Sequence, residues 1–364
     1  MMRLSVGCLV VMAMSIAASA ADPARLPRDN LLLYPSAGGT PARVKTVADW
    51  EKRRATIRGG MEAVMGKLPG AEKRCPLDLK IEEAIDAGSY WRRRISYASE
   101  PGCRVPAYLL VPKAVLRNGK KAPAVLCLHP TDNTIGNGVV VGLGGRANRA
   151  YASELAERGF VVLAPSYPLL ARYQPDVKSL GWESGTLKAV WDNIRGLDLL
   201  ESLPFVAGKR FAAIGHSLGG HNSVFTAVFD DRLQVVVSSC GLDAFPDYYN
   251  GNPANWNRER GWCQTRYMPR LAAYKGRLQE IPFDFSELIG ALAPRHVLIV
   301  APTRDANFRA ESVDRIVASA KPIFALYGHA DRLAVEHPDC EHDFPLPMRV
   351  KSYQLINQVL KQSE

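Results

Sequence analysis

The pattern of apolar and polar positions changes near residue 120, where short apolar, mostly β-branched runs begin to alternate with helical segments. Short apolar runs bounded by turn residues are typical of buried strands. Strands that alternate with helices form βαβ units, whose sheet is mostly parallel and covered by helices on both faces. The pattern predicts an α/β fold with strands at 122–130, 160–165, 210–215, 233–240, 296–302 and 332–338.

A helix is predicted ahead of this region, at residues 46–65, where apolar side chains recur at helical spacing. Thr46 and Asp49 have the spacing of a capping box, and Gly66 suits the C-terminal end of the helix. Residues 78–112 alternate in short stretches broken by Gly and Pro, as expected for antiparallel strands at a sheet edge.

One segment interrupts the alternation: residues 242–292 separate two predicted strands and are rich in Tyr, Trp, Pro and Asn. A connection of this length in a compact domain either serves function or carries structure of its own. We interpret it as a lid-type insertion whose aromatic side chains line a pocket; alternatively, they pack the insertion onto the domain. The aromatic residues are Tyr248, Tyr249, Trp256, Trp262 and Tyr267, of which Trp256, Trp262 and Tyr267 are the candidates for substrate binding.

The first twenty residues have the pattern of an export signal. They combine one Arg with a short apolar run and end in Ala18-Ser19-Ala20, which suits cleavage after Ala20. An N-terminal membrane anchor is the alternative, and the shortness of the run argues against it. No later stretch approaches a membrane span. We expect a secreted or periplasmic protein with three parts. They are a signal peptide at 1–20, an extension with one amphipathic helix at 21–74, and an α/β domain at 75–364.

The composition is that of a globular protein: 364 residues, 47% hydrophobic and 23% charged, which excludes disorder and fibres. The net charge of +10 favours acidic polysaccharides or anionic surfaces at long range. The basic clusters at 52–54 and 92–94 lack aromatic interleaving and any known nucleic-acid motif. We interpret them as solvated faces and expect no nucleic-acid partner.

Six cysteines follow the predicted signal peptide, and an oxidising compartment would permit disulfides among them. Cys127 and Cys240 lie in or beside apolar runs, which indicates small buried side chains. Cys75 with Cys103 is a plausible bridge, and the full pairing is left open.

The candidate nucleophile lies in the stretch GHSLG at 215–219, which fits the pattern G-x-S-x-G. The pattern alone can arise by chance, but Ser217 follows a predicted strand and opens a predicted helix, the context that a nucleophile elbow requires. Gly215 and Gly219 permit the sharp turn, and Gly220 permits close packing of the helix.

A serine hydroxyl is a poor nucleophile until a base removes its proton and a third group orients that base. In this fold class the order is Ser, acid, His, with the His after the last strand, and only His329, His337 and His342 come late enough. His342 falls in the turn before the final helix and is the candidate base. His337 lies at the end of the strand and His329 precedes it, so we interpret both as structural.

Asp305 is the candidate acid because it follows the strand 296–302, where a carboxylate can reach the far ring nitrogen of His342. Consecutive strands are usually neighbours, which favours Asp305 over Asp243, the main alternative. Asp243 opens the insertion, where an Asp ordinarily caps or turns the chain.

An acyl-transfer site also needs N–H donors for the developing oxyanion. The residue after the nucleophile, Leu218, supplies one. The second comes from the loop LHPTDN, where Pro130 has no N–H, so Thr131 is the candidate. The His-Gly-Gly pattern common in esterases does not occur in this loop.

The sequence motifs give only weak support for a cofactor or metal site. GHSLG lacks the Gly-Lys-Ser/Thr ending of a phosphate loop, and GLGGRA at 142–147 is a weak match to a dinucleotide loop. His337, Cys340, His342 and Asp343 have the spacing of metal ligands, but no second ligand pair appears elsewhere. We therefore expect no cofactor and no metal.

Taken together, the stretches LHPT, ERGFVVLAPSYP, GHSLGGHN, APTRDANF and PDCEHDFP resemble the α/β-hydrolase superfamily, closest to its dienelactone-hydrolase-like and acetylxylan-esterase-like branch. The resemblance covers about residues 75–360 and implies a serine esterase with Ser217, Asp305 and His342 as nucleophile, acid and base. Dienelactone hydrolases use a cysteine nucleophile, so the serine argues against their substrate. An acetylated carbohydrate is suggested by analogy alone.

The function expected from the sequence is a secreted carboxylic ester hydrolase that acts on esterified plant-polysaccharide fragments through an acyl-enzyme on Ser217. A prolyl-oligopeptidase-like peptidase is the second hypothesis, although no propeller domain precedes the catalytic region. The third is a binding protein on the same fold without catalysis. The acyl group, the alcohol portion and the oligomeric state are left open.

Overall fold

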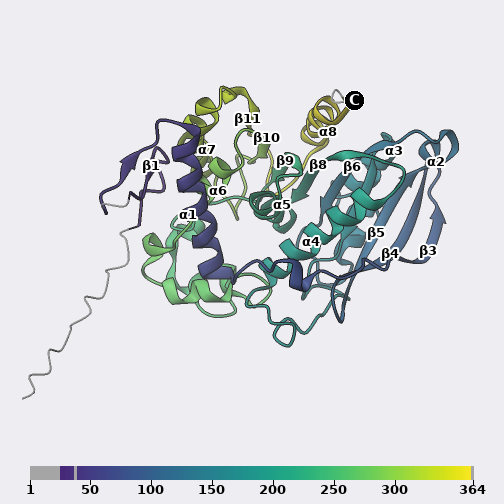
Figure 1. Ribbon diagram of the computed structural model, residues 1–364, viewed down its shortest axis with the longest axis horizontal. Helices are drawn as coiled ribbons and strands as arrows, with labels where there is room; N and C mark the ends of the chain where they lie inside the picture. Colours follow the sequence, from purple (N-terminus) through teal and green to yellow (C-terminus); the bar gives the residue numbers. More distant parts are fainter. Residues whose placement is uncertain (1–24, 37–38, 362–364) are drawn as a thin grey trace, which may run out of the picture.

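The computed structural model describes residues 25–36 and 39–361, so the predicted signal peptide lies outside the described residues. A nine-stranded sheet has the order β11-β10-β9-β8-β6-β7-β5-β4-β3 (Figure 1). Its strands from β6 onward are parallel, which confirms the predicted α/β class. They are β6 (Ala122–Leu128), β7 (Val161–Pro165), β8 (Val206–His216), β9 (Leu233–Ser239), β10 (His296–Val300) and β11 (Leu333–Glu336).

Antiparallel strands extend one edge of the sheet, as predicted for residues 78–112. The innermost of them pairs with β7 and so joins the two parts of the sheet. The outermost is exposed along its whole length, and its charged side chains, among them Glu82 and Glu83 beside Arg94, oppose pairing with a foreign strand. These strands are β3 (Lys80–Asp86), β4 (Tyr90–Glu100) and β5 (Cys103–Pro112), and the short α2 (Lys113–Asn118) follows them.

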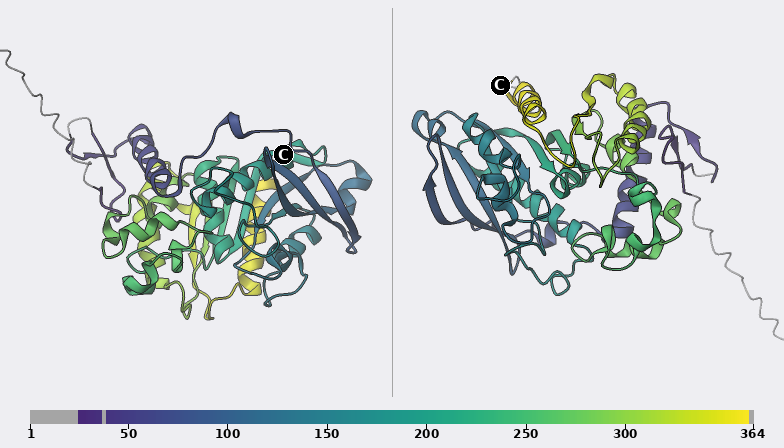
Figure 2. Two further views of the ribbon diagram at one scale, coloured as in Figure 1. Left: turned by 90° about the horizontal axis from the view of Figure 1, so that it is seen from below. Right: turned by 180° about the vertical axis from the view of Figure 1, so that it is seen from behind.

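Helices cover both faces of the parallel strands (Figures 1 and 2). Within β6, Leu126 packs into one apolar cluster and its neighbours Val125 and Cys127 into the other. Because both faces are buried, the strands appear in the sequence as continuous apolar runs. One cluster includes α4 (Gly185–Ser202), α5 (Leu218–Phe229), α6 (Phe285–Ala291) and α7 (Ala310–Leu326); the other includes α3 (Tyr151–Glu157) and α8 (Leu346–Lys361).

The N-terminal helix forms where the sequence predicts it, as α1 (Val47–Met65), with a capping box between Thr46 and Asp49. Its apolar face, which includes the fully buried Trp50 and Met61, packs against α6. The short strands β1 (Leu33–Tyr34) and β2 (Ala42–Arg43) pair beside it. The burial of these apolar side chains thus stabilises the position of the extension on the domain.

One basic residue of the cluster 52–54 departs from the expected solvated face. The side chain of Arg53 is only 1% exposed, and its Nη2 lies 2.6 Å from a carboxylate oxygen of the buried Glu287 in α6. Arg25 pairs with the second oxygen of the same carboxylate at 2.6 Å. The expectation was wrong because α6 supplies a buried carboxylate that holds two arginines of the extension.

The segment 242–292 is built from short 3₁₀ helices and α6, and its aromatic residues form much of its own core. Trp256 is 0% exposed, and its ring meets those of Phe245 and Tyr248 edge-on. Such edge-to-face contacts suit aromatic packing. The short helices are η3 (Tyr248–Gly251), η4 (Pro253–Trp256), η5 (Gly261–Cys263), η6 (Pro269–Tyr274) and η7 (Leu278–Glu280).

The expected bridge between Cys75 and Cys103 is wrong, because both thiols are unpaired. Cys103 is buried, with its Sγ 3.4 Å from the hydroxyl of Tyr173, whereas the Sγ of Cys75 faces the carbonyl of Ala98 at 4.0 Å. Cys127 and Cys240 are buried, as expected from the apolar runs around them.

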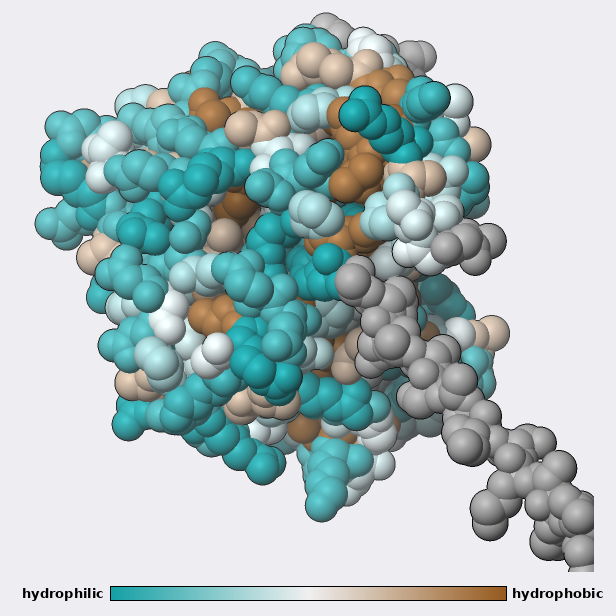
Figure 3. All heavy atoms as spheres, turned by 90° about the vertical axis from the view of Figure 1, so that its left-hand side faces the viewer, coloured by the Kyte–Doolittle hydropathy of each residue, from teal (hydrophilic) through white to brown (hydrophobic). Residues whose placement is uncertain are grey.

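The face that carries the N-terminal extension is mostly hydrophilic, with apolar side chains in separate small patches (Figure 3). In the part of the chain that the structure describes, no helix combines the length and the apolar character needed to cross a bilayer.

Candidate active site

The stretch 215–219 forms a sharp turn between β8 and α5. Ser217 has φ 55° and ψ −119°, a backbone conformation that is rare for residues other than glycine. Its N–H donates to the carbonyl of Ser239 at 2.7 Å, and its carbonyl accepts from the N–H of His221 at 3.1 Å. These hydrogen bonds hold the strained turn in place, so the serine is presented at the carboxyl end of β8.

Glycine is required on both sides of this serine for steric reasons. A Cβ on Gly219 would lie 2.0 Å from the carbonyl oxygen of Leu128, at the end of β6. A Cβ on Gly215 would lie 2.2 Å from the backbone of Gly219. The turn therefore packs directly onto the neighbouring strand, and no side chain fits at either position.

His342 and Asp305 come together on the same edge of the sheet. The Nδ1–H of His342 donates to Oδ2 of Asp305 at 2.8 Å. The other carboxylate oxygen of Asp305 accepts the backbone N–H groups of Asn307 and Phe308, at 2.8 and 3.2 Å. Because β10 and β11 are neighbours, the loops that follow them lie side by side. This leaves Nε2 of His342 as the ring nitrogen available to a proton of the serine.

The loop that carries His342 is anchored from the opposite half of the sheet. Arg149, which precedes α3, forms an ion pair with Asp343 and donates to the backbone carbonyl of His342 at 3.2 Å. Asn148 donates to the second oxygen of Asp343 at 2.7 Å, and the thiol of Cys240 donates to its carbonyl at 3.3 Å. The imidazole is therefore positioned by contacts beyond its own carboxylate partner.

His216, between Gly215 and Ser217, lies against the candidate base. Its ring centroid is 4.8 Å from that of His342, and its Nδ1 is 3.1 Å from the hydroxyl of Ser239. Burial lowers the pKa of His216 well below its usual range, and the nearby Arg149, His342 and Arg146 lower it further. At neutral pH His216 is therefore uncharged, and its side chain lines the site.

Asp243, the alternative acid, lies elsewhere. It is fully buried, and within the described residues neither of its carboxylate oxygens accepts a hydrogen bond. Burial, with a smaller contribution from the nearby Asp247, raises the pKa of Asp243 to about 7. The capping or turn bond expected of Asp243 is thus not formed.

The two other late histidines also lie apart from the serine. His337 is held between the carbonyl of Ala301, 2.7 Å from its Nδ1, and the carboxylate of Asp314, 3.0 Å from its Nε2. His329 precedes η8 (Ala330–Arg332), ahead of β11. Both placements agree with a structural role.

The two candidate oxyanion donors flank the serine. Leu218 is the first residue of α5, and Thr131 lies in the loop after β6, which Gly219 contacts closely. In that loop the buried His129 accepts the N–H of Tyr167 at 2.9 Å, while its Nδ1–H donates to the carbonyl of Pro130 at 2.8 Å. These bonds brace the backbone that carries Thr131.

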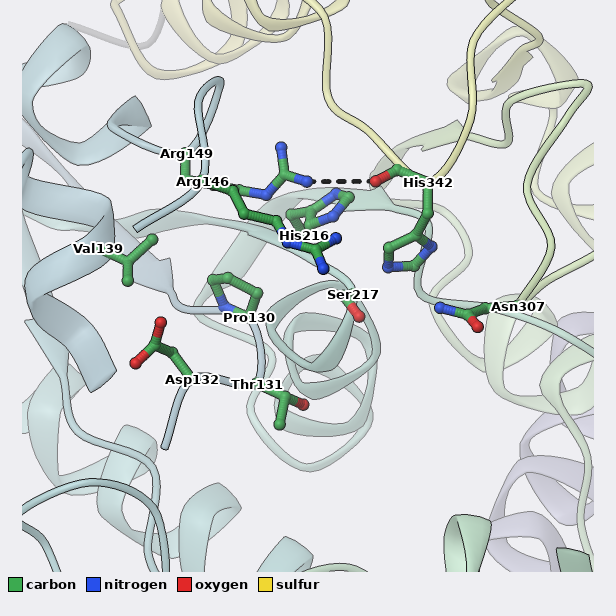
Figure 4. A pocket seen from close by; sticks show the side chains of 10 residues that line it. All are labelled: Pro130, Thr131, Asp132, Val139, Arg146, Arg149, His216, Ser217, Asn307 and His342. Carbon is green, nitrogen blue, oxygen red and sulfur yellow. Dashed lines mark hydrogen bonds between the residues drawn. The ribbon is translucent and has the colours of Figure 1, made fainter. Parts of the chain in front are cut away.

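Two cavities meet at Ser217, and they differ in chemistry. The cationic lobe, of about 290 Å³, contains His342 and two arginines (Figure 4). The aromatic lobe, of about 170 Å³, is lined in part by the segment 242–292. Both share Thr131, Ser217 and Asn307. The cationic lobe adds Pro130, Asp132, Val139, Arg146, Arg149, His216 and His342; the aromatic lobe adds Leu218, His221, Tyr248, Gly261, Trp262, Gln264, Tyr267 and Phe308.

The three candidate substrate-binding aromatics separate into two groups. Trp262 and Tyr267 line the aromatic lobe, and the hydroxyl of Tyr267 is 3.0 Å from that of Thr131. Trp256 lines neither lobe, because it is enclosed in the core of the insertion. A pocket-lining role for Trp256 is therefore not supported by its position.

A possible ligand set for a metal involves the same residues. Single ligand atoms of Cys240, Asp305 and His342 lie within 4.8 Å of one another. Burial raises the pKa of the Cys240 thiol well above its usual range, and Nδ1 of His342 is already bonded to Asp305. Metal binding needs a thiolate and a free imidazole nitrogen, so these groups suit a hydrogen-bonded arrangement better than an ion.

Several residues of the site carry no distinctive sequence signal. Arg146 lies in the run GLGGRA, whose pattern suggests only a weak dinucleotide loop, and Arg149 follows it in a loop without a motif. His221 follows the elbow, but only the structure shows that its buried Nε2 lacks a partner among the described residues. Such roles depend on contacts between distant loops.

Comparison with known proteins finds similarity to esterases and hydrolases. A family model described as "Glucuronyl esterase, fungi" matches residues 181–328, which include Ser217 and Asp305 and end before His342. A glucuronoyl esterase from Solibacter usitatus is 19% identical, with a TM-score of 0.69 over 90% of this chain and 97% of that one. The chain has the α/β-hydrolase fold.

Further comparisons also find an esterase and a protein named as a hydrolase. A glucuronoyl esterase of carbohydrate esterase family 15 from Caldicellulosiruptor kristjansonii is 19% identical, with a TM-score of 0.66 over 92% of this chain and 90% of that one. YtaP of Bacillus subtilis, whose name describes it as a hydrolase, is 27% identical over 63% of this chain and 74% of its own length. The fold of this chain is thus similar to that of esterases over nearly its whole length.

The contact between His342 and Asp305 predicts that Asp305→Asn lowers kcat by about 10⁴, because an amide at that place favours the wrong imidazole tautomer. Asp243→Asn is the matched control, with a much smaller effect expected on turnover. Steady-state kinetics of both purified variants tests this. Collapse of turnover in Asp243→Asn with full activity in Asp305→Asn would reverse the assignment.

The burial of Asp243 predicts a pH dependence of stability. Its pKa is about 7 in the folded protein and near the ordinary value of 3.8 in the unfolded chain. The contribution of protonated Asp243 to the free energy of unfolding is therefore fully present below pH 4, and it is lost as the pH rises toward 7. Urea unfolding across this range should show that the free energy of unfolding falls less with rising pH in Asp243→Asn than in wild type. The control Asp331→Asn, at an exposed position, should show the same pH dependence as wild type. Parallel curves of unfolding free energy against pH for all three proteins would contradict the prediction.

Proposed function

We propose that the protein is a serine carboxylic ester hydrolase with Ser217 as nucleophile, His342 as base and Asp305 as the carboxylate that orients it. The observation that carries the proposal is the 2.8 Å bond between Nδ1 of His342 and Asp305, in a cavity that the strained Ser217 also lines. A serine in this turn, an imidazole and a buried carboxylate together supply what acyl transfer requires.

In the proposed reaction, Nε2 of His342 accepts the proton of Ser217 Oγ as this oxygen attacks the ester carbonyl. The N–H groups of Leu218 and Thr131 bind the oxyanion that develops. The protonated His342 then donates its proton to the leaving alkoxide, which gives the free alcohol and an acyl-enzyme. Water attacks the acyl-enzyme in the same way and releases the acid.

The position of the base indicates how an ester would lie in the two lobes. His342 lines the cationic lobe and not the aromatic lobe. Because the leaving alcohol must receive the proton of His342, we place the alcohol portion in the cationic lobe and the acyl portion in the aromatic lobe.

An esterified carbohydrate is the proposed substrate class. Sugar rings stack on aromatic faces, and Trp262, Tyr267 and Phe308 line the aromatic lobe. The match to the glucuronyl esterase family model favours a uronoyl ester, in which the sugar itself is the acyl group. An acetylated sugar is the second candidate, supported by the similarity to a Bacteroides fragilis protein described as "a putative acetyl xylan esterase", with a TM-score of 0.59. An export signal at 1–20 would bring the enzyme to such polymers outside the cytoplasm.

A hydrolysis panel on the purified mature protein tests the class. It compares glucuronate methyl and benzyl esters, acetylated xylan, short and long acyl esters, and peptide amides. Preference for the uronate esters supports the first candidate, and preference for acetylated xylan supports the second. Preference for peptide amides would reject ester hydrolysis in favour of a peptidase.

Ser217→Ala and His342→Ala should each lower kcat by several orders of magnitude without unfolding the protein, because the three residues act as one unit. His337→Ala is the control and should be far milder, since this imidazole contacts Ala301 and Asp314 instead. Kinetics with circular dichroism, and labelling of Ser217 by a phosphonate probe, provide the measurement. An unlabelled Ser217 in a folded protein would favour a binding protein without catalysis.

The two tryptophans of the insertion should differ in their effects. Trp262→Ala should lower kcat/KM for carbohydrate esters about tenfold and change that for small aryl acetates little, because it removes a stacking surface. Trp256→Ala should destabilise the protein by about 3 kcal/mol by opening a cavity in the core of the insertion. Kinetics and thermal unfolding of both variants test this. A uniform kinetic effect with a lower Tm in Trp262→Ala would mean that this residue only packs the segment.

A further inference from the structure

The cationic lobe contains one guanidinium that the fold does not use. Arg149 is engaged by Asp343 and by backbone carbonyls. Arg146 is exposed, and no hydrogen bond or ion pair joins it to another residue in the described ranges 25–36 and 39–361. Figure 4 shows its side chain reaching into the cavity that Ser217 and His342 also line. The structure therefore presents an unpaired cation beside the nucleophile.

The loop that bears Arg146 is shaped to present it. Gly144 and Gly145 have φ values of 120° and 87°, in the region that favours glycine. A Cβ on Gly145 would lie 2.9 Å from a methyl carbon of Val139, in η2 (Gly136–Val141), so the loop packs closely on that helix. The turn is thus defined by the backbone, and the arginine follows it directly.

The other charged groups around the lobe do not neutralise Arg146. Asp132 lines the same cavity, but its Oδ1 accepts three backbone N–H groups of its own loop and it forms no ion pair with Arg146. His216 is neutral at pH 7 because burial and the surrounding positive charges lower its pKa. Arg146 thus has no ion-pair partner of its own among the described residues, and the carboxylate of Asp132 in the same lobe disfavours a dianion relative to a monoanion.

We propose that Arg146 binds a carboxylate carried by the alcohol portion of the substrate. A guanidinium with free N–H donors matches a carboxylate in charge and in its two-pronged geometry. The location on the alcohol side rests on the proposed function, because it follows from proton transfer by His342 to the leaving group. Arg146 thereby selects esters whose alcohol is an acid.

A kinetic experiment compares two esters with the same acyl group, one of benzyl alcohol and one of 4-(hydroxymethyl)benzoic acid. Wild type should prefer the carboxylated ester by about tenfold in kcat/KM, a factor typical of a charge-assisted hydrogen bond. Arg146→Gln should abolish the preference, and Arg146→Lys should retain part of it. The exposed Arg277→Gln, outside both lobes, should keep the full preference. A preference unchanged in Arg146→Gln overturns the proposal.

A binding experiment does not depend on catalysis and so separates failure of this proposal from failure of the proposed function. Calorimetry on Ser217→Ala should detect 4-(hydroxymethyl)benzoate but not benzyl alcohol, and added salt or Arg146→Gln should remove the signal. Absence of benzoate binding at millimolar concentration, or equal binding in Arg146→Gln, overturns the proposal even if esters are hydrolysed. Tighter binding of inorganic phosphate that requires Arg146 would also overturn it, in favour of a dianion site.

Discussion

The close approach of the 215–219 turn to the end of β6 is the constraint on which the site depends. Because a Cβ at Gly219 would meet the carbonyl of Leu128, the N-terminus of α5 and the loop after β6 can lie in contact. Thr131 and Leu218 line the same lobe as Ser217, which suits the proposed role of their two backbone N–H groups. The strained backbone of Ser217, which costs on the order of 1–3 kcal/mol, is tolerated because the turn is hydrogen-bonded to β9.

A second set of contacts extends across the carboxyl edge of the sheet. Ser217 follows β8, Asp305 follows β10, and His342 lies beyond β11, whereas Arg149 comes from the connection between β6 and β7. The ion pair between Arg149 and Asp343 therefore joins loops from both sides of β8. The imidazole is held from two directions, by the Asp305 carboxylate and by this pair on the adjacent residue.

Much of this could be predicted from the sequence, because it depends on local patterns. Buried parallel strands produce continuous apolar runs, capping residues mark α1, and the elbow has a glycine spacing imposed by sterics. The order of strands brings the loops of Asp305 and His342 together without knowledge of any contact. These features follow from residues near one another in the chain.

The predictions that were wrong and the site residues that were missed depend instead on contacts between residues far apart in the chain. Arg53 is buried because Glu287, far away in the sequence, supplies a carboxylate, and Trp256 is buried because Phe245 and Tyr248 enclose it. Cys75 and Cys103 are close in sequence, yet their thiols face different partners. Arg146 and Arg149 become part of the site only when the chain folds over Ser217. Tertiary contacts of this kind leave no periodicity for sequence analysis to detect.

The division of the cavity into two lobes has a consequence for the fate of the acyl-enzyme. In the proposed reaction, the alcohol vacates the cationic lobe while the acyl group stays attached in the aromatic lobe. Water and any second alcohol then approach the carbonyl through the same vacated space. Hydrolysis and transacylation would therefore compete for one entrance, and the occupancy of that lobe would set the ratio of free acid to newly formed ester.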